Sequence, residues 1–367
     1  MKFGPYHLAR FEALSRELDI WGIELCGVEE KYEWKRQSRN PRILTLTDGA
    51  HENVGTVALV LAVFKCLRKL KPDVIFIPGY SEPACLAAAL WGILCAGRNI
   101  LMSDSTAIDR PRKRTVEMFK SFLVKNLFHG GFVSGKRALR YLTHLGMPHS
   151  KICLGYDAVD NDYFYQGCAI CRRTSSPEAS GVPRHYFLCV ARLAGEKNIE
   201  LLLRSFFRYR SRGGVWSLVV VGNGPLDREL KAIAAKSEHG ELVTFAGHKS
   251  SSEIIPYYAF ASALILPSQS EPWGLVINEA MACGLPVIAS QACGACDDLI
   301  VNGETGFVFD PRSDSELCEA MLTMSQMPRE KYEAIAAESR RGVGVYSIEA
   351  FRMSAVSAVM AASSGVR

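Results

Sequence analysis

The sequence has no uncharged apolar run long enough to cross a lipid bilayer. The longest one, residues 84–97, ends at Arg98 and falls short of the roughly 20 residues that a membrane-spanning helix needs. We therefore expect residues 84–97 to form a core helix, and we expect no integral membrane segment. No secretory signal peptide opens the chain, which predicts a cytoplasmic protein.

Internal repeats and low-complexity segments are also absent, which argues against a repeat architecture. The net charge is only +5 over 367 residues, a length that predicts two domains. The excess of Lys and Arg lies within the first 160 residues, and a basic half suits an acidic partner such as an anionic membrane or a phosphorylated substrate. No nucleic-acid-binding motif accompanies this charge, so we expect no nucleic acid partner.

The 12 cysteines do not show the spacing of a zinc site, and most of them lie within apolar segments. Two CxxC pairs occur, Cys168 with Cys171 and Cys293 with Cys296. Each pair lacks a second pair or a histidine at zinc-finger spacing. We expect free thiols in a reducing compartment, no bound metal and no cofactor.

Short β-rich runs alternate with helical patterns along the whole chain. They are continuously apolar, which indicates strands of parallel sheets that helices cover on both faces. The sequence therefore predicts an α/β protein with two doubly wound, Rossmann-like domains. The expected strands are 42–47, 73–79, 99–105, 131–135, 151–157, 186–193, 216–224, 242–247, 263–268 and 286–290.

Residues 166–185 separate the two sets of strands. This stretch is rich in Ser, Pro and Arg and lacks periodicity, so we expect a linker between residues 1–165 and residues 186–345. Nearly every expected strand ends in Gly, Ser, Asp or Pro. Because open α/β sheets bind ligands beyond the carboxyl ends of their strands, these loops should face a cleft between the two domains.

The segment QSEPWGLVINEAMACGLPVIAS, residues 269–290, follows one of these strands. We expect a helix to begin close to Gly274 and Leu275 and to stop at Gly284 and Pro286. The free N–H groups at the start of a helix bind anions well. This helix is therefore expected to offer an anion site at the sheet edge.

Two carboxylates lie in this segment, Glu271 in the loop and Glu279 near the second helical turn. Apart from Asn278 the helix is apolar all round, so we expect Glu279 to be buried, where an unmatched carboxylate is costly. Glu279 could instead bond to backbone or a cation, and Glu271 could be a solvated loop residue. We favour separate functional roles for the two over a shared acid–base role.

Two cations follow the first strand of the second half. Arg192 ends that strand, and Lys197 lies in the loop that leads to the next helix. Taken alone they could be ordinary surface charges. Combined with a helix N-terminus that also favours anions, they predict a diphosphate site.

Glycines follow the next two strands. Gly222 and Gly224 form a GxG turn, but Asp227 occupies the third glycine position of a dinucleotide fingerprint. We interpret the turn as one that lets the backbone approach a ligand. Gly247 and His248 end the following strand and form a candidate rim for a nucleobase.

Together these residues resemble the C-terminal domain of retaining GT-B glycosyltransferases of family 4. Glu271 and Glu279 match the Glu-x7-Glu motif of that family. Residues 346–362 are similar to its final helix, which crosses back to the N-terminal domain, so that 346–367 would be a crossover helix and tail. The further matching segments are Arg192 with Lys197, GNGP at 222–225, residues 245–290, and DLIVNGETGFVFDP at 298–311.

The resemblance implies a role for each matching residue. Arg192 and Lys197 would bind the donor diphosphate and stabilise the charge on the departing nucleotide. Glu279 would hold the ribose hydroxyls, and Glu271 would contact the donor sugar near the reacting carbon. The backbone N–H groups that would contact sugar or phosphate belong to Gly274, Leu275 and Val276.

The implied reaction moves a hexose-type sugar from a nucleotide-diphosphate-sugar donor to a hydroxyl acceptor, with retention and without a metal. The expected acceptor is a lipid-linked or polysaccharide intermediate of cell-surface or exopolysaccharide synthesis. Two alternatives stay open. One is another GT-B enzyme, such as a sugar-phosphate synthase or an epimerase. The other is a non-catalytic subunit that binds sugar nucleotides.

The N-terminal half offers acceptor-side candidates in its loops: His7, residues 80–82 and Asp104. Asp104 or His7 could orient or deprotonate the acceptor hydroxyl, although Asp104 could equally cap a turn. Only residues 1–3 precede Gly4, so the first strand of the resembled fold is expected to be absent or truncated.

Residues 109–131 concentrate basic and apolar side chains. A basic amphipathic helix is typical of attachment to an anionic membrane surface. The alternative is an ordinary helix whose apolar face packs on the sheet, and the pattern does not separate the two. The residues concerned are Arg110, Arg112, Lys113, Arg114, Lys120 and Lys125, with Met118, Phe119, Phe122, Leu123, Leu127 and Phe128 between them.

Overall fold

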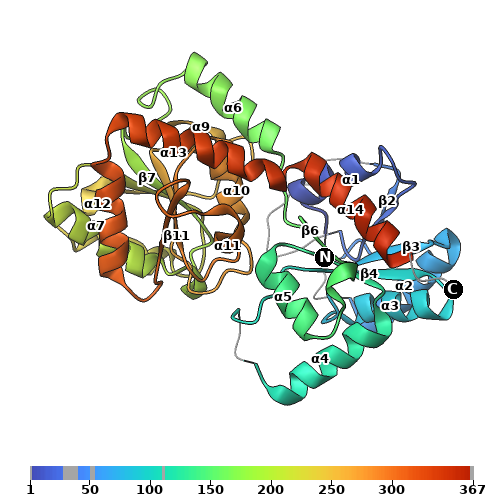
Figure 1. Ribbon diagram of the computed structural model, residues 1–367. Coiled ribbons are helices and arrows are strands. Elements are labelled where there is room, and N and C mark those ends of the chain that lie inside the picture. Colours follow the sequence, from blue (N-terminus) through green and yellow to red (C-terminus); the bar gives the residue numbers. More distant parts are fainter. Residues whose placement is uncertain (1, 28–39, 50–53, 110–111, 364–367) are drawn as a thin grey trace. The chain divides into compact units, whose positions relative to one another are not determined.

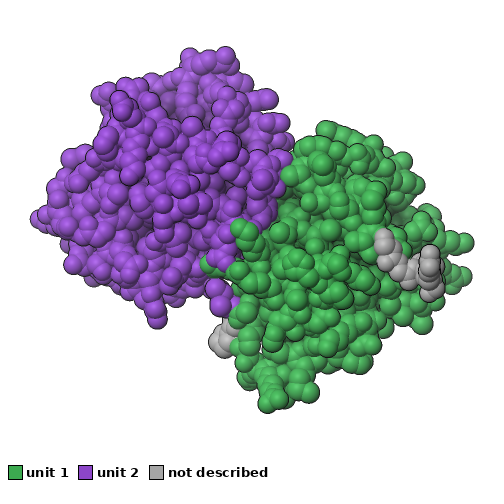
Figure 2. Space-filling view, in the orientation of Figure 1, with its two compact units in different colours: residues 1–107, 112–159, 348–367 green, residues 108–111, 160–347 purple. Residues whose placement is uncertain are grey.

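The computed structural model describes residues 2–27, 40–49, 54–109 and 112–363. The chain divides into two compact units (Figure 2). Unit 1 contains residues 1–107, 112–159 and 348–367, and unit 2 contains residues 108–111 and 160–347. Each unit has its own parallel sheet, which confirms the expected α/β class with two Rossmann-like domains.

Unit 1 opens with a helix and then alternates strands with helices. Its elements are α1 Pro5–Leu14, β1 Gly22–Glu24, β2 Ile43–Thr45, α2 Thr56–Leu70, β3 Val74–Pro78, α3 Pro83–Leu94, β4 Arg98–Ser103, α4 Arg114–Leu127, β5 Gly130–Val133, α5 Lys136–His144, the 3₁₀ turn η2 His149–Lys151, β6 Ile152–Leu154 and α14 Ile348–Ser363.

The main sheet of unit 1 has four parallel strands in sequential order, β3-β4-β5-β6. β1 and β2 form a separate parallel pair. Right-handed crossovers between sequential neighbours place their helices on one face of a sheet. Accordingly α3, α4 and α5 pack together there, around Ile77, Leu101 and Val133. The opposite face needs a cover from elsewhere in the chain.

Helices α1 and α14 provide that cover (Figure 1). Leu14 of α1 and Phe351 of α14 pack on Ile100 and Phe132 of the sheet. Because α14 follows unit 2 along the chain, the polypeptide returns to unit 1 after residue 347. This is the return expected for the segment 346–362.

Unit 2 begins with a helix that precedes its first strand. Its elements are α6 Asn161–Thr174, β7 Tyr186–Val190, η3 Gly195–Lys197, α7 Ile199–Ser211, β8 Ser217–Val221, α8 Asp227–Ala235, η4 Gly240–Leu242, β9 Val243–Gly247, α9 Ile255–Phe260, β10 Ala263–Leu266, α10 Leu275–Ala282, β11 Val287–Ser290, α11 Cys296–Leu299, β12 Gly306–Phe309, α12 Asp314–Ser325, α13 Arg329–Gly342 and η5 Val343–Tyr346.

The six strands of unit 2 are parallel and have the order β12-β11-β10-β7-β8-β9. Along the chain, β8 and β9 are added on one side of β7. The next strands, β10, β11 and β12, are then added on the other side of β7. The winding therefore reverses between β7 and β10, which are hydrogen-bonded neighbours. Open α/β sheets bind their ligands beyond the carboxyl ends of the strands at such a reversal.

The ten strands expected from apolar runs each correspond to an observed strand. Two further strands were not expected, β1 and β12. The expected linker at 166–185 needs correction, because α6 occupies its first part and the units divide after residue 159. Asp160 caps α6 by accepting from the Tyr163 amide at 2.9 Å. Phe164 and Cys168, one turn apart, are buried.

No helix in the described part of the chain is both long enough and apolar enough to cross a membrane. The apolar run 84–97 mainly forms α3, whose inner side chains are buried as expected. Its outer side is not a core surface, however. Leu90, Ile93 and Leu94 are 48%, 41% and 77% exposed.

Candidate functional site

Two of the expected site residues meet where the winding of unit 2 reverses. Lys197 lies at the end of η3, after β7, and its Nζ forms an ion pair with the carboxylate of Glu271, after β10. Ser268 also donates to this carboxylate, at 3.3 Å. The two side chains are 74 residues apart in sequence, and the adjacency of β7 and β10 brings them together.

The Lys197–Glu271 pair is largely withdrawn from solvent, with side chains 21% and 14% exposed. Burial by itself would lower the pKa of Lys197, but the charge of Glu271 and its hydrogen bond outweigh burial and raise that pKa. The ammonium therefore stays charged at neutral pH. It is a fixed positive charge at the place where the fold binds ligands.

Asn198 ties together the loops around this pair. Its side-chain amide donates to the carbonyls of Pro267 and Pro311 at 3.1 and 2.9 Å, and its Oδ1 accepts from Gln269 at 3.2 Å. The Gln269 amide donates to the Glu196 carbonyl at 2.8 Å. The loops after β7, β10 and β12 are thereby held in one arrangement. Sequence reasoning missed Asn198, although Asn tolerates the left-handed backbone (φ 58°) that it adopts.

Helix α10 begins at Leu275, as expected, after Gly274 in the left-handed region (φ 102°). A Cβ on Gly274 would come within 2.9 Å of the Leu266 side chain and 3.3 Å of Glu271 Cγ. Glycine thus lets the loop turn tightly enough to hold Glu271 beside the helix start. The first N–H groups of the helix, including those of Leu275 and Val276, have no acceptor within it.

Glu279 is only 2% exposed, which confirms its expected burial. Its Oε2 accepts a 2.6 Å hydrogen bond from the hydroxyl of Tyr258 on α9, which is also fully buried. The contact to Tyr258 offsets part of the desolvation that a buried carboxylate suffers. Tyr258 was missed at the sequence level, because nothing in the local pattern links α9 to α10.

The GxG turn after β8 makes a close backbone approach, but to the protein itself. A Cβ on Gly222 would overlap the carbonyl oxygen of Ala191, and one on Gly224 would overlap the backbone of Leu193. The Leu193 amide donates to the carbonyl of Asn223 at 2.8 Å. The two glycines therefore seat the loop after β8 against the loop after β7. Whether the turn also brings the backbone close to a ligand stays a prediction.

Arg192 and His248 are exposed after β7 and β9. In the described ranges no carboxylate pairs with Arg192, so its charge is available to an anion. Gly247 has a positive φ of 70°, with open space where a side chain would lie. Arg192 and Lys197 are the two cations that follow the strand at the winding reversal.

The acceptor-side candidates of unit 1 do not all lie together. His7 and Tyr156 lie near the buried Arg10, whose charge lowers the pKa of His7 and whose guanidinium lies 5.1 Å from the centre of the Tyr156 ring. The charge of Asp104 acts on the pKa of Tyr156. Asp104 follows β4, and Tyr156 follows β6. Tyr80 instead lies among groups of α4 and α5.

Arg10 organises this cluster, and sequence reasoning missed it. Its guanidinium donates to the Ala158 carbonyl at 2.8 and 3.0 Å and pairs with Asp157 at 3.4 Å. It also faces the rings of Tyr156 and Phe351, at 5.1 and 5.8 Å. A buried guanidinium with these partners is a rigid donor group beside the candidate acceptor residues.

His7 is kept neutral within this cluster. Burial, reinforced by the charge of Arg10, lowers its pKa from 6.5 to about 4. Its Nδ1 accepts from the Gly4 amide at 3.2 Å, which requires an unprotonated nitrogen. His7 is therefore a weak base, and the carboxylate of Asp104 is the better candidate to orient an acceptor hydroxyl.

The basic segment 109–131 turns part of its charge inward. Lys120 and Arg112 pair with Glu117 at 2.9 and 3.7 Å. The Arg112 guanidinium also lies over the ring of Tyr141, at 4.5 Å, and the Tyr141 hydroxyl donates to Glu117 at 2.9 Å. Arg110 lies outside the described residues.

The apolar side chains of α4 divide between two faces. Leu123 and Val124 are buried in unit 1, as the ordinary packed helix requires. On the outward face Met118, Phe119 and Phe122 are 65%, 60% and 61% exposed. The ordinary packed helix is thus observed on the inner face, and attachment to a membrane stays a prediction for the exposed face.

All 12 cysteines are free thiols, as expected. Cys293 and Cys296 of the second CxxC pair interact with each other. Cys168 lies 3.0 Å, sulfur to sulfur, from Cys283 at the end of α10. Within the described ranges, no group of three or more His, Cys, Asp or Glu side chains is arranged to hold a metal ion.

Two α/β units, each built on a parallel sheet, together with a last helix that returns to the first unit, are the features of a GT-B fold. A glycosyltransferase from Rickettsia africae has a TM-score of 0.71 at 15% identity and covers 88% of this chain and 86% of its own. Anabaena HepE in complex with UDP-glucose has a TM-score of 0.69 at 18% identity, with coverages of 87% and 85%. At such low sequence identity, the structural similarity shows that the fold is shared and no more.

Residues 173–342 match the family model described as glycosyl transferases group 1. The sulfoquinovosyl transferase SQD2 of Arabidopsis thaliana is 32% identical over 160 residues, 43% of this chain and 29% of that protein. A GDP-mannose-dependent phosphatidylinositol monomannoside mannosyltransferase of Mycobacterium tuberculosis is 29% identical over 163 residues, 42% of each chain. The chain spans less than half the length of these relatives.

Proposed function

We propose that this protein is a retaining glycosyltransferase that moves a sugar from a nucleotide-diphosphate donor to a hydroxyl acceptor. The observation that carries the proposal is the buried Lys197–Glu271 pair beside the start of α10, at the winding reversal of unit 2. The group 1 match over residues 173–342 supports it. Relatives named as transferases of mannose and sulfoquinovose support it as well.

The donor nucleotide would be held by groups from three loops. Lys197 and Arg192 would neutralise the diphosphate, together with the free N–H groups at the start of α10. Glu279 would accept from the ribose hydroxyls while it keeps its contact with Tyr258. Gly247 and His248 would border the base. The structural neighbour HepE, which is described in complex with UDP-glucose, supports a nucleotide-sugar as the donor.

The chemistry would be a front-face displacement. The bond from the anomeric carbon to the diphosphate oxygen breaks, the acceptor oxygen bonds to the same face, and the acceptor proton passes to the departing phosphate. Lys197 and Arg192 would stabilise the charge that develops on that phosphate, so no metal ion is needed. Glu271 would hold the sugar next to the reacting carbon, and Asp104 would orient the acceptor hydroxyl.

The variants Lys197→Gln and Glu271→Gln test this function. Loss of a group that stabilises the leaving-group charge typically lowers kcat about 10²–10³-fold, and we expect this for Lys197→Gln. Glu271→Gln should reduce kcat and also weaken donor binding. Lys236→Gln and Glu241→Gln, two exposed residues of unit 2, are matched controls.

The substrate for these assays would come from a panel of nucleotide sugars screened by thermal shift, since ligands of the folded state raise its stability. Sugar transfer to a membrane extract is then measured for all four variants. Wild-type rates in Lys197→Gln and Glu271→Gln would contradict the proposal. Binding of a nucleotide sugar by the unmodified protein, with no transfer to any acceptor, would support a non-catalytic subunit instead.

We further propose a cytoplasmic protein that meets a lipid-linked acceptor at an anionic membrane surface. The outward face of α4 supports this, because Phe119 and Phe122 are exposed next to the exposed Arg114 and Lys125. The variant Phe119→Ser with Phe122→Ser should reduce flotation with anionic vesicles. Flotation equal to that of the unmodified protein would remove α4 from the proposal.

A further inference from the structure

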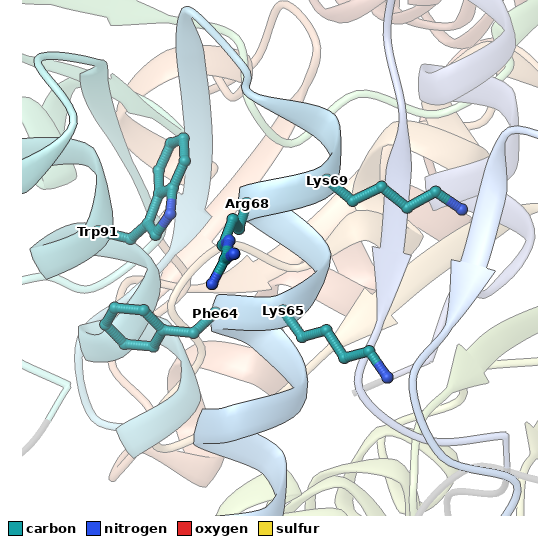
Figure 3. Close-up of a pocket in the computed structure, with 5 residues that line it drawn as sticks. All are labelled: Phe64, Lys65, Arg68, Lys69 and Trp91. Atoms are coloured by element: carbon teal, nitrogen blue, oxygen red, sulfur yellow. The ribbon is translucent and has the colours of Figure 1, made fainter.

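A hollow of about 570 Å³ lies between α2 and α3 of unit 1, far along the chain from the donor-side residues. It is lined by Phe64, Lys65, Arg68 and Lys69 of α2 and by Trp91 of α3. In Figure 3 the Arg68 side chain lies between the two aromatic rings, and the Lys65 and Lys69 side chains extend away from these rings. Neither the donor site nor the acceptor-side cluster uses these residues.

The three cations of the hollow are close neighbours along α2. Lys65, Arg68 and Lys69 are spaced i, i+3 and i+4, which places them on adjoining positions of one helix surface. All three are exposed. In the portion of the chain with described coordinates, no carboxylate forms an ion pair with any of them. The hollow is therefore a concentrated positive charge that suits an anion.

The two helices that line the hollow also carry exposed apolar side chains. On α2, Val57 and Leu61 precede the cations and are 72% and 64% exposed. On α3, Leu90, Ile93 and Leu94 are neighbours of Trp91 in sequence and are 48%, 41% and 77% exposed. Large exposed apolar side chains on adjacent helices suit an interaction surface.

We propose that this hollow binds the phosphate of an anionic phospholipid, while the apolar side chains of α2 and α3 enter the acyl region of the bilayer. The proposal rests on the membrane association proposed above and extends it to a second surface. Helix α3 packs against both α2 and α4. The apolar residues of α2 and α3 therefore belong to the same helical layer as Phe119 and Phe122 of α4.

A phospholipid fits the hollow better than other anions do. Free phosphate would bind to the three cations but would leave the exposed leucines without an apolar partner. A single-stranded nucleic acid binds by stacking its bases on exposed aromatic faces, and Trp91 is only 7% exposed. A phospholipid carries a phosphate and apolar chains in one molecule, and both parts find matching side chains here.

The test is flotation of the full chain with vesicles of phosphatidylcholine alone and of phosphatidylcholine mixed with phosphatidylglycerol. The first variant combines Lys65→Gln, Arg68→Gln and Lys69→Gln. Each basic residue near an anionic surface contributes roughly a five-fold factor to partitioning, so we expect partitioning to fall on the order of 100-fold. The control combines Arg204→Gln, Arg208→Gln and Arg212→Gln, exposed residues of unit 2, and removes the same charge elsewhere.

A second variant, Leu61→Ser with Leu94→Ser, keeps the cations and removes apolar contact, and we expect it to lower partitioning about ten-fold. Glycerol phosphate is added as a soluble competitor. Thermal unfolding of each variant checks its fold. Turnover of a soluble nucleotide sugar is measured on the same samples, and it should be unchanged in both unit 1 variants.

Three results would overturn the proposal. The first is partitioning of the cation variant equal to that of the unmodified protein, and the second is an equal loss in the control. The third is an unaffected leucine variant together with full competition by glycerol phosphate, which would assign the hollow to a soluble phosphate. Failure of the unmodified protein to turn over any sugar nucleotide would contradict the proposed function and leave the vesicle result standing.

Discussion

At the scale of single residues, Glu279 illustrates how a charge is accommodated in the core of unit 2. Its carboxylate is buried inside α10 and accepts from the hydroxyl of Tyr258 on α9. Removing one partner of a buried hydrogen bond leaves the other with its desolvation uncompensated. The stability of unit 2 therefore depends on a hydroxyl that lies outside the Glu-x7-Glu segment.

We expect Tyr258→Phe to lower the free energy of unfolding by about 1–3 kcal/mol, because it leaves the buried carboxylate without that donor. Urea denaturation followed by circular dichroism measures the change. Tyr257→Phe, one residue away on α9 and only partly buried, is the control and should change stability by less than about 0.5 kcal/mol. Equal effects of the two changes would contradict the assigned role of the Tyr258 hydroxyl.

His7 predicts a specific pH dependence in unit 1. Its pKa is about 4 in the folded protein and 6.5 as the ordinary value, so between these values the unfolded chain binds the extra proton. Stability then falls as pH decreases from 6.5 to 4, by up to about 3 kcal/mol for this group. Above pH 6.5 His7 is neutral in both the folded and the unfolded chain, so it no longer makes stability depend on pH.

Substituting His7 with Gln should remove this component of the acid sensitivity. Urea midpoints at pH 7 and pH 5 measure it. His144→Gln on the exposed end of α5 is the control and should retain the full pH dependence. An unaltered slope in His7→Gln would show that other groups account for the acid sensitivity.

At the scale of elements, the glycines of unit 2 set how closely its loops approach one another. Gly222 has a φ of 138°, and a Cβ there would overlap the Ala191 carbonyl, which is backbone and has nowhere to move. Gly213 also has a positive φ, of 85°, but faces open space. A comparison of substitutions at Gly222 and Gly213 therefore separates the cost of backbone strain from the cost of a steric clash.

We expect Gly222→Ala to destabilise the protein by about 3 kcal/mol or more, because strain and clash add. Gly213→Ala, which introduces strain alone, should cost about 1–2 kcal/mol. Denaturant unfolding measures both, and weaker binding of the donor should accompany only the first. Similar costs at the two positions would contradict a clash with Ala191.

At the scale of the whole molecule, α14 belongs to the core of unit 1 although it follows unit 2 in the chain. Sequential right-handed crossovers cover only one face of the unit 1 sheet. Phe351 fills the other face, with its ring 5.2 Å from that of Phe132 between centroids. The fold of unit 1 is therefore incomplete until the last helix has been made.

We expect Phe351→Ala to destabilise unit 1 by about 3–5 kcal/mol, the usual cost of removing a buried aromatic side chain. Hydrogen exchange should accelerate for the amides of β4, β5 and β6 and stay unchanged for β7 to β11. Met353→Ala on the same helix, where Met353 is 60% exposed, should leave both sets unchanged. Loss of protection in both units would contradict a core role confined to unit 1.

Much of this fold was predictable from local pattern. Strands buried on both faces appear as continuous apolar runs, and ten of them were found in this way. The exceptions have physical causes. β1 contains one apolar residue, Ile23, between Gly22 and Glu24, and β12 lies in a segment rich in turn residues. The second part of α6 was taken for a linker, because Cys168 is the one buried residue between positions 166 and 174.

The candidate site was predictable residue by residue, but not as an arrangement. The start of α10 and the burial of Glu279 follow from the spacing of Gly, Pro and apolar residues. The pairing of Lys197 with Glu271 depends on β7 lying next to β10, and strand order leaves no local trace in the sequence. The inward turn of Arg112 and Lys120 likewise depends on Tyr141, which approaches from another helix.

The sequence by itself determined the α/β class, the start and end of α10, and the residue types that suit a diphosphate. These properties depend on backbone preferences and on periodic burial, which act over a few neighbouring residues. Only the tertiary structure decided which charges meet, which glycines touch backbone, and that α2, α3 and α4 expose apolar side chains. Those outcomes depend on contacts between segments far apart in the chain, because strand order and helix packing bring distant side chains within a few ångströms.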